Sequence, residues 1–119
     1  ISSTVKPVYN PHNGRLLLVV REKNNYFVVR DGKESRRYNS IFAESLSFSR
    51  DGKHVAFVAA SGERQFVVLD GTEGRRYDRI LPVDGARISF DGPDSLWYNA
   101  LKNRTQIYRV TEKFTEPKE

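Results

Sequence analysis

The stretch FVVRDGKESRRY, residues 27–38, returns 39 residues later as FVVLDGTEGRRY, residues 66–77, with nine of its twelve positions identical. In each copy an Asp-Gly pair separates an apolar run from a polar, arginine-containing one. Asp-Gly tolerates the positive φ angles of tight hairpin turns, and Val, Phe and Tyr favour pleated, half-buried strands. The phrase therefore predicts a strand, a tight turn and a second strand, and the chain contains this unit more than once.

The same 39-residue offset extends beyond the quoted phrase, and further along the chain it becomes 41 residues. The segment 81–85 lengthens one connection by three residues, and the turn near Gly92 is shorter by one. Insertions of this kind belong in loops, so the order of the strands is kept. The related positions are Tyr9 with Phe48, Leu16 with Val55, Leu18 with Phe57, Val19 with Val58 and Ile41 with Ile80 at offset 39, and Val55 with Leu96, Phe57 with Tyr98, Gln65 with Gln106 and Phe66 with Ile107 at offset 41.

Each unit has the pattern of short strands, and the second unit shows it best. Its expected strands span residues 45–49, 54–60, 64–69 and 75–80. No window of the sequence carries a sustained helical period with caps, so we predict an all-β chain. Because the fourth strand of the third unit is missing or weak, the expected total is 11 strands. The three units cover about 6–41, 43–80 and 84–111, and a polar tail follows at 112–119.

A four-stranded antiparallel meander of about 40 residues cannot bury both of its faces alone. Stacking such sheets face to face around an axis buries them, and each sheet is then a blade of a β-propeller. The sequence therefore predicts a β-propeller-type array of four-stranded antiparallel blades. It holds about two and three-quarter blades and forms a single partial propeller over residues 1–119.

The phrase LSFSRDGKHVAFV, residues 46–58, resembles the WD-like propeller repeat of bacterial TolB-type proteins. That pattern is F-S-P-D-G-x-x-[VIL]-A-[FY] followed by a strand, and this chain departs from it at Arg50, where the family usually has Pro. The other two copies, YNPHNG at 9–14 and FDGP at 90–93, are more divergent. The resemblance covers nearly the whole chain. It implies propeller blades like those of periplasmic accessory proteins and of the gating domain of prolyl-oligopeptidase-like peptidases, whose hydrolase domain this sequence lacks.

The number of blades raises the question of closure. Closed propellers typically have four to eight blades, and this chain supplies fewer than three. An open stack exposes an apolar sheet face at each end and an unpaired strand edge. We therefore expect either a piece of a longer propeller or association of copies. A homodimer of two such chains has 22 strands, whereas six blades need 24.

Composition sets bounds on the partner. The chain has 119 residues, which fits one domain, and its 20 basic and 15 acidic residues give a net charge of +5. This charge permits an acidic partner but does not require one, because the acidic residues are interspersed. The absence of cysteine excludes disulfides and thiol chemistry. The longest apolar run, residues 16–20, is far shorter than the roughly 18 residues of a membrane span.

No pattern in the sequence favours catalysis, a metal or a cofactor. His12 and His54 both fall in expected hairpin turns without a cluster of carboxylates, so we interpret both as solvated turn residues. There is no G-x-S-x-G elbow and no glycine-rich phosphate motif. Hairpin geometry accounts for the Asp-Gly pairs at residues 31–32, 51–52, 70–71 and 91–92 better than calcium binding does, because each turn offers a single carboxylate. The chain is therefore expected not to be an enzyme.

The arginine pairs are the most informative charges. Adjacent strand residues face opposite sides, so one member of each pair faces each flank of its blade, and equivalent side chains could align as a basic stripe. The structural alternative is that they pack on Tyr38 and Tyr77 and pair with Glu34, Glu73 or Asp78. Nucleic-acid binding is disfavoured, because the regular placement of the aromatic residues favours packing. The four candidates for an interaction surface are Arg36, Arg37, Arg75 and Arg76.

One loop breaks the repeat, and it is a second candidate contact. Residues 81–86 interrupt the offset, and binding residues concentrate on loops carried by rigid frames. Leu81, Pro82 and Asp84 therefore join the candidate interaction surface. Trp97, the only tryptophan, takes the place of Ala56 in the preceding unit, and we expect it to fill a gap between blades.

Together these patterns predict a non-enzymatic scaffold that offers loops and a blade face to another protein. The resemblance implies part of a larger propeller in an envelope-associated, periplasmic or extracytoplasmic assembly. One alternative is the substrate-gating propeller portion of a prolyl-oligopeptidase-like hydrolase. Another is a lectin-like oligomer that binds a ligand between its blades.

Overall fold

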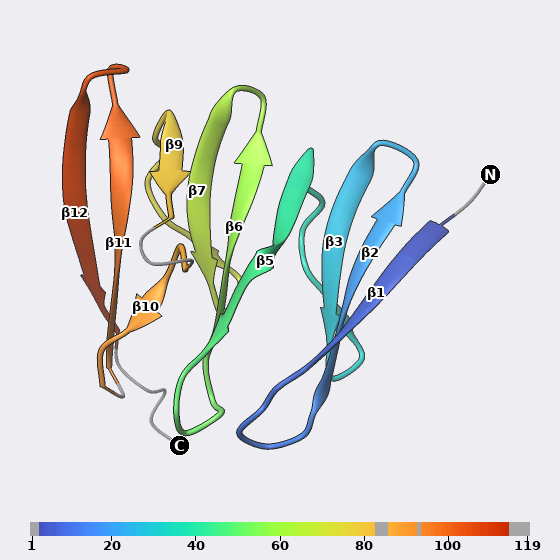
Figure 1. Ribbon diagram of the computed structural model, residues 1–119. Coiled ribbons are helices and arrows are strands. Elements are labelled where there is room, and N and C mark those ends of the chain that lie inside the picture. The colour runs from blue at the N-terminus through green and yellow to red at the C-terminus, as the bar shows by residue number, and fades with distance from the viewer. Residues whose placement is uncertain (1–2, 83–85, 93, 115–119) are drawn as a thin grey trace.

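The computed structural model describes residues 3–82, 86–92 and 94–114 (Figure 1). This part of the chain contains twelve β-strands and no helix, so the all-β prediction is confirmed. The strands are β1 (Ser3–Tyr9), β2 (Leu16–Glu22), β3 (Asn25–Arg30), β4 (Lys33–Glu34), β5 (Ser40–Phe48), β6 (Val55–Ser61), β7 (Arg64–Leu69), β8 (Thr72–Glu73), β9 (Arg79–Leu81), β10 (Ser89–Phe90), β11 (Ser95–Lys102) and β12 (Gln106–Lys113).

The strands form three antiparallel sheets of four, which Figure 1 shows side by side along the chain. The first sheet has the order β1-β2-β3-β4 and the second has the order β5-β6-β7-β8. In the third sheet β11 lies between β12 and a row that holds both β10 and β9. The described residues form an open stack, without closure into a ring.

The middle sheet is buried on both faces, because its strands alternate apolar residues toward both neighbours. Along β6, residues Val55 to Ala59 are all buried. Phe57 belongs to a core shared with the first sheet, and Val58 belongs to a core shared with the third. A strand that is apolar at every position needs cover on both sides, and this stack supplies it. The second sheet therefore holds the other two together.

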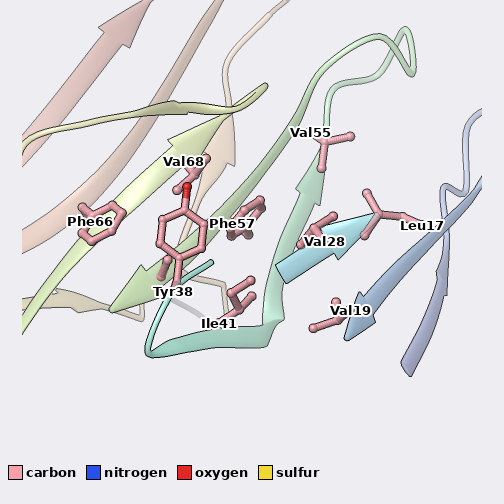
Figure 2. Packing of buried hydrophobic residues seen from close by; sticks show 10 residues of the cluster. Leu17, Val19, Val28, Tyr38, Ile41, Val55, Phe57, Phe66 and Val68 are labelled. Carbon is pink, nitrogen blue, oxygen red and sulfur yellow. The ribbon is translucent and has the colours of Figure 1, made fainter. Parts of the chain in front are cut away.

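Aromatic and aliphatic side chains fill the core between the first two sheets (Figure 2). Tyr38 lies edge-on to Phe57 and to Phe66, with ring centroids 6.2 and 5.6 Å apart. Leu17 and Val28 reach this core from the first sheet. The second core packs Ile80, Leu96 and Tyr98 against β6 and β7 in the same way.

The fourth strands of the first two repeated units are shorter than the sequence suggests. A strand was expected at 75–80, but the structure has β8 at Thr72–Glu73, and Tyr77 makes only an isolated bridge to Gln65. Residues Arg79–Leu81 pair with β11 and belong to the third sheet. Similarly, Ser40 and Ile41 pair with β6, so they belong to the second sheet. Because this crossing segment forms a strand of its own as β9, the count is twelve rather than 11.

The strand register explains the changing offset. Seven residues, 82–88, separate the paired segments β9 and β10, where β5 has four, 43–46, so three residues are added. The turn between β10 and β11 is one residue shorter than the turn between β5 and β6. The loop 103–105 between β11 and β12 is one residue longer than its counterpart at 62–63.

That longer loop corrects two predicted equivalences. Ala59 pairs with Phe66, and the related Ala100 pairs with Tyr108. The offset for β12 is therefore 42, so Phe66 corresponds to Tyr108 rather than Ile107, and Gln65 corresponds to Ile107 rather than Gln106. A slip of one residue moves a side chain to the other face of the sheet, so the correction decides which side chains face solvent.

The expected polar tail begins later than predicted. Glu112 and Lys113 pair with β11 as the end of β12. Phe114 packs against the second core, with its ring 4.6 Å from the His54 ring and 6.1 Å from the Phe90 ring. Residues 112–114 therefore belong to the fold, whereas 115–119 lie outside the described residues.

Candidate functional site

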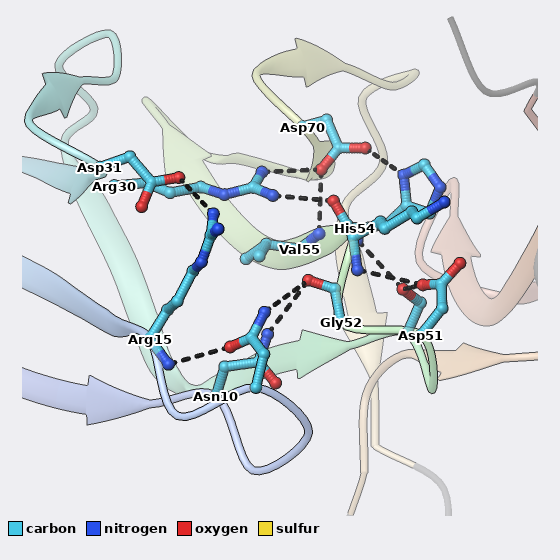
Figure 3. A network of polar contacts seen from close by, with 12 residues as sticks. Asn10, Arg15, Arg30, Asp31, Asp51, Gly52, His54, Val55 and Asp70 are labelled. Carbon is cyan, nitrogen blue, oxygen red and sulfur yellow. Dashed lines mark hydrogen bonds and ion pairs between the residues drawn. The ribbon is translucent and has the colours of Figure 1, made fainter.

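A polar junction ties the first sheet to the second (Figure 3). Asp70 occupies the tight turn after β7, with φ 48°, and its Oδ1 accepts hydrogen bonds from the Val55 backbone N–H (2.9 Å) and from Arg30 Nη1 (3.0 Å). Its Oδ2 lies 2.6 Å from His54 Nδ1. Arg30 comes from β3 and also donates to the carbonyl of Lys53 (2.7 Å). One carboxylate therefore joins a turn, a strand and the neighbouring sheet.

Asp31, the equivalent carboxylate of the first sheet, is more exposed and makes fewer contacts than Asp70. Asp31 lies 39 residues before Asp70 and meets Arg15, the equivalent of His54, at 3.5 Å. These side chains are 54% and 71% exposed, whereas the His54 side chain is 5% exposed. The interpretation of His54 as a solvated turn residue is therefore wrong, although His12 is exposed as expected. Burial of His54 depends on Phe114, 60 residues further along the chain, and no local pattern indicates it.

Two turns also stack at this junction. Asn10 and Asn13 both donate from Nδ2 to the Gly52 carbonyl, at 3.3 and 3.1 Å. Gly52 has φ +75°, and a Cβ placed there would lie 2.8 Å from Asn13 Nδ2. In the same turn Asp51 accepts bonds from Ser49 Oγ and from the Lys53 N–H, and these two bonds hold the pKa of Asp51 below its ordinary value. The turn is thereby fixed by side chains of both sheets.

Beside the junction, clefts open between neighbouring sheets. The first, about 350 Å³, lies between the first and second sheets and has an apolar floor that includes Leu17 and Phe57. The second, about 470 Å³, lies between the second and third sheets. Positions 39 residues apart line the two clefts, so they are equivalent places in the stack. These paired positions are Arg30 and Leu69, Asp31 and Asp70, Lys33 and Thr72, Glu34 and Glu73, and Ser35 and Gly74.

Two of the candidate arginines have the same contacts in both sheets. Arg37 lies over the Phe27 ring at 4.0 Å and pairs with Glu34 at 3.1 Å. Arg76 lies over the Phe66 ring at 5.0 Å and pairs with Glu73 at 3.5 Å. The predicted pairing with the two glutamates is confirmed.

The predicted ring partners are wrong, for two reasons. Tyr38 is 5% exposed and points into the core, so its ring is not available to an arginine on the surface. The phenylalanines on the neighbouring strands take that place. The other expected acidic partner, Asp78, instead accepts the Arg104 backbone N–H at 2.8 Å.

The remaining arginines lie on the surface. The Arg36 side chain is 80% exposed, and its Nη1 reaches Glu73 of the neighbouring sheet at 3.6 Å. Arg75 is also exposed.

Two buried tyrosines have raised pKa values. Burial, and then the Glu73 carboxylate, raise the pKa of Tyr38 to about 12. In the third sheet Tyr98 donates to Glu112 at 2.9 Å, and burial raises the pKa of Tyr98 as well.

The candidate loop is described only in part. Leu81 ends β9 and pairs with Asn99, which leaves it partly buried, and Pro82 is exposed. Asp84 lies outside the described residues. Trp97 lies on β11 between two residues of the second core, so it faces away from the second sheet, and Arg109 covers its ring at 4.1 Å.

The outer face of the first sheet is apolar and exposed, which sequence reasoning located only as an unspecified open end. Val5, Tyr9 and Leu16 have exposed fractions of 50%, 65% and 44%. Val5 pairs with Val20, and Tyr9 pairs with Leu16, so all four side chains share one face of the sheet, although Val20 itself is buried.

Among the described residues, no three His, Asp or Glu side chains converge as a metal site would require. That part of the chain also has no helix of the length and apolarity that a bilayer crossing needs. Comparisons with protein families, curated proteins and solved structures give no match for this chain.

Proposed function

We propose that this chain is a non-enzymatic scaffold of the β-propeller type that binds a further sheet on the outer face of its first sheet. The observation that carries the proposal is the repeat itself. Leu16, Leu18 and Val20 on the outer face correspond, 39 residues on, to Val55, Phe57 and Ala59. In the second sheet these three are buried in the core shared with the first sheet.

The chain therefore contains an example of what covers such a face. In the buried interface, Leu17, Val19 and Val28 of the first sheet pack against the second. A partner sheet presenting residues of that size and polarity would fit the outer face in the same way. Contiguous exposed apolar patches on soluble proteins mark interaction sites, and further sheets of a larger propeller would bury this one.

The native mass in solution tests the proposal. We expect masses above the 13.7 kDa of one chain, rising with protein concentration, because the exposed face associates. Tyr9→Lys places a charge on this face and should return the mass to that of a monomer. Thr105→Lys adds the same charge in an exposed turn of the third sheet and should leave association unchanged.

The form of the association identifies the occupant. A single species of about 27 kDa, twice 13.7 kDa, means that a second copy covers the face. A series of masses that Tyr9→Lys abolishes means that copies of this chain add one after another through the face, without closing into a single species. A wild-type protein that stays monomeric at all concentrations, with Tyr9→Lys behaving identically, would overturn the proposal.

The paired clefts favour a second candidate, ligand binding between sheets in the manner of a lectin. The first cleft falls within the size range of small-molecule sites, and Arg30, Asp31 and Lys33 on its rim could orient a polar ligand. Titration with a panel of neutral and charged monosaccharides, followed by NMR shifts, tests it. Saturable shifts confined to cleft residues support the candidate, and their absence at millimolar sugar rejects it.

A further inference from the structure

The edge of β12 that faces away from β11, called its outer edge, differs from the equivalent edges of β3 and β7 in what pairs with it. In the first sheet, β4 pairs with β3 through Val29↔Glu34 and Arg30↔Lys33, and Tyr38 bridges to Tyr26. In the second sheet, β8 and Tyr77 cover β7 in the same way. No residue from the described ranges pairs with β12 on the side away from β11.

Local sequence explains why no tight turn follows at the equivalent place in β12. The pairs Asp31-Gly32 and Asp70-Gly71 all have positive φ, from 48° to 84°, which makes the tight turns into β4 and β8. At the equivalent place β12 has Glu112 and Lys113, which continue to pair with Leu96 and Ser95. The Phe114 N–H then bonds to the Asp94 carbonyl at 2.8 Å. Phe114 therefore lies beside the segment that connects β10 and β11.

The edge has the hydrogen-bonding pattern of a strand that can be extended. In β7, Gln65 exchanges two backbone bonds of 2.8 Å with Tyr77, and the Val67 carbonyl accepts from Gly74 at 2.8 Å. The register makes Ile107 and Arg109 the counterparts of Gln65 and Val67. Alternate residues of an antiparallel strand bond to opposite neighbours, so the N–H and C=O groups of these two point outward.

Side chains on β12 also match what the fourth segments supply elsewhere. Tyr108 is the counterpart of Phe27 and Phe66, the rings that Arg37 and Arg76 cover. The Tyr108 side chain is 44% exposed, and Ile107 beside it is 66% exposed. Each covering arginine follows a glutamate by three residues and precedes a tyrosine. The uncovered position on β12 therefore fits a segment with that spacing.

We propose that an extended segment of a partner protein, carrying a Glu-x-x-Arg-Tyr sequence, adds as an antiparallel strand to the outer edge of β12. A second copy of this chain is disfavoured as the donor, because residues 33–38 and 72–77 are already paired within their own sheets. The site is an edge of the third sheet, so it is independent of the face of the first sheet. Addition of a strand to an exposed edge is a recurrent mode of peptide recognition.

Peptides copied from the chain test the proposal on the intact 119-residue chain. The probe is DGKESRRYNSI, residues 31–41, with a fluorescent label, and its anisotropy reports binding. We expect saturable binding. Replacing the arginine equivalent to Arg37 by alanine should weaken it about two- to fivefold, as loss of one cation–π contact does. The same change at the position of Arg36 is the matched control and should have little effect, because Arg36 contacts a neighbouring sheet.

Variants of the protein locate the site. Ile107→Pro removes one outward N–H and should abolish peptide binding, since proline at an outward-facing edge position spares the β11–β12 ladder. Tyr108→Ala removes the ring without altering the backbone, and it should weaken binding as much as the Arg37 peptide change does, even if the proline variant fails to fold. No binding of the probe at millimolar concentration, or binding that Tyr108→Ala and the Arg37 change leave intact, would overturn the proposal.

Discussion

At the scale of single residues, replacing two glycines by alanine distinguishes the free-energy cost of a strained backbone from the cost of a lost contact. Gly52 (φ +75°) and Gly62 (φ +63°) both have left-handed backbones, but only at Gly52 would a Cβ meet another atom, Asn13 Nδ2 at 2.8 Å. Alanine at either position should cost about 1–2 kcal/mol for the backbone alone. We expect Gly52→Ala to lose about 1 kcal/mol more, because the Asn13 hydrogen bond is displaced. Urea unfolding measures both, and equal losses would show that the contact contributes nothing.

Tyr38 gives a prediction for alkaline pH. Its pKa in the folded protein is about 12, against about 10 in the unfolded chain. Between these values the unfolded state releases its proton while the folded state keeps it, so the free energy of unfolding falls as pH rises from 10 to 12. Tyr38→Phe should make this fall shallower. Urea unfolding at several pH values checks it, and identical slopes with and without the substitution would contradict the role of Tyr38.

At the scale of elements, the turns after β3 and β7 have the same sequence pattern, but their aspartates make different numbers of contacts. Asp70 holds Arg30, His54 and the Val55 N–H, whereas Asp31 holds only an exposed Arg15. Asn keeps the left-handed turn while removing the charge. We therefore expect Asp70→Asn to cost about 2 kcal/mol and Asp31→Asn less than about 1 kcal/mol. Thermal or urea unfolding of the pair measures the difference, and equal costs would mean that the junction does not link the sheets.

The same elements show what a sequence can and cannot predict. The strands and the Asp-Gly turns follow from local propensity, so Asp31 and Asp70 take the expected positive φ. The longer loop 103–105 escaped detection because its positive-φ residues are Asn103 and Arg104, without a glycine. Of these two, only Asn103 carries a local signal, since Asn tolerates the left-handed region.

Longer-range features of the candidate site had no signal in the sequence at all. Burial of His54 requires Phe114, and the contact of Arg36 with Glu73 requires the second sheet to pack beside the first. The pairing of the arginines with nearby glutamates was predictable because the two members of each pair are three residues apart in the sequence. Contacts between sheets depend on stacking, which periodicity alone does not specify.

At the scale of the whole molecule, burial of the strands decreases from the middle sheet of the stack to the third sheet. Residues 55–59 of β6 are buried on both faces, whereas β12 is largely exposed and no described residue pairs with its outer edge. Local opening costs least where few apolar contacts are lost. Opening of β12 exposes one side of one core, but opening of β6 disrupts both cores. The free energy of opening should therefore rise from the third sheet to the second.

Hydrogen exchange on the native protein tests this order. We expect the slowest amide exchange in β6 and β7, intermediate exchange in β2 and β11, and the fastest in β12. Protection should be lowest at the outward N–H groups of Ile107 and Arg109, which no described residue accepts, and it should rise at these two amides when a strand-forming peptide is added. If β12 were as protected as β6 in the protein alone, its outer edge would already be covered, and both the open stack and the proposed strand addition would be wrong.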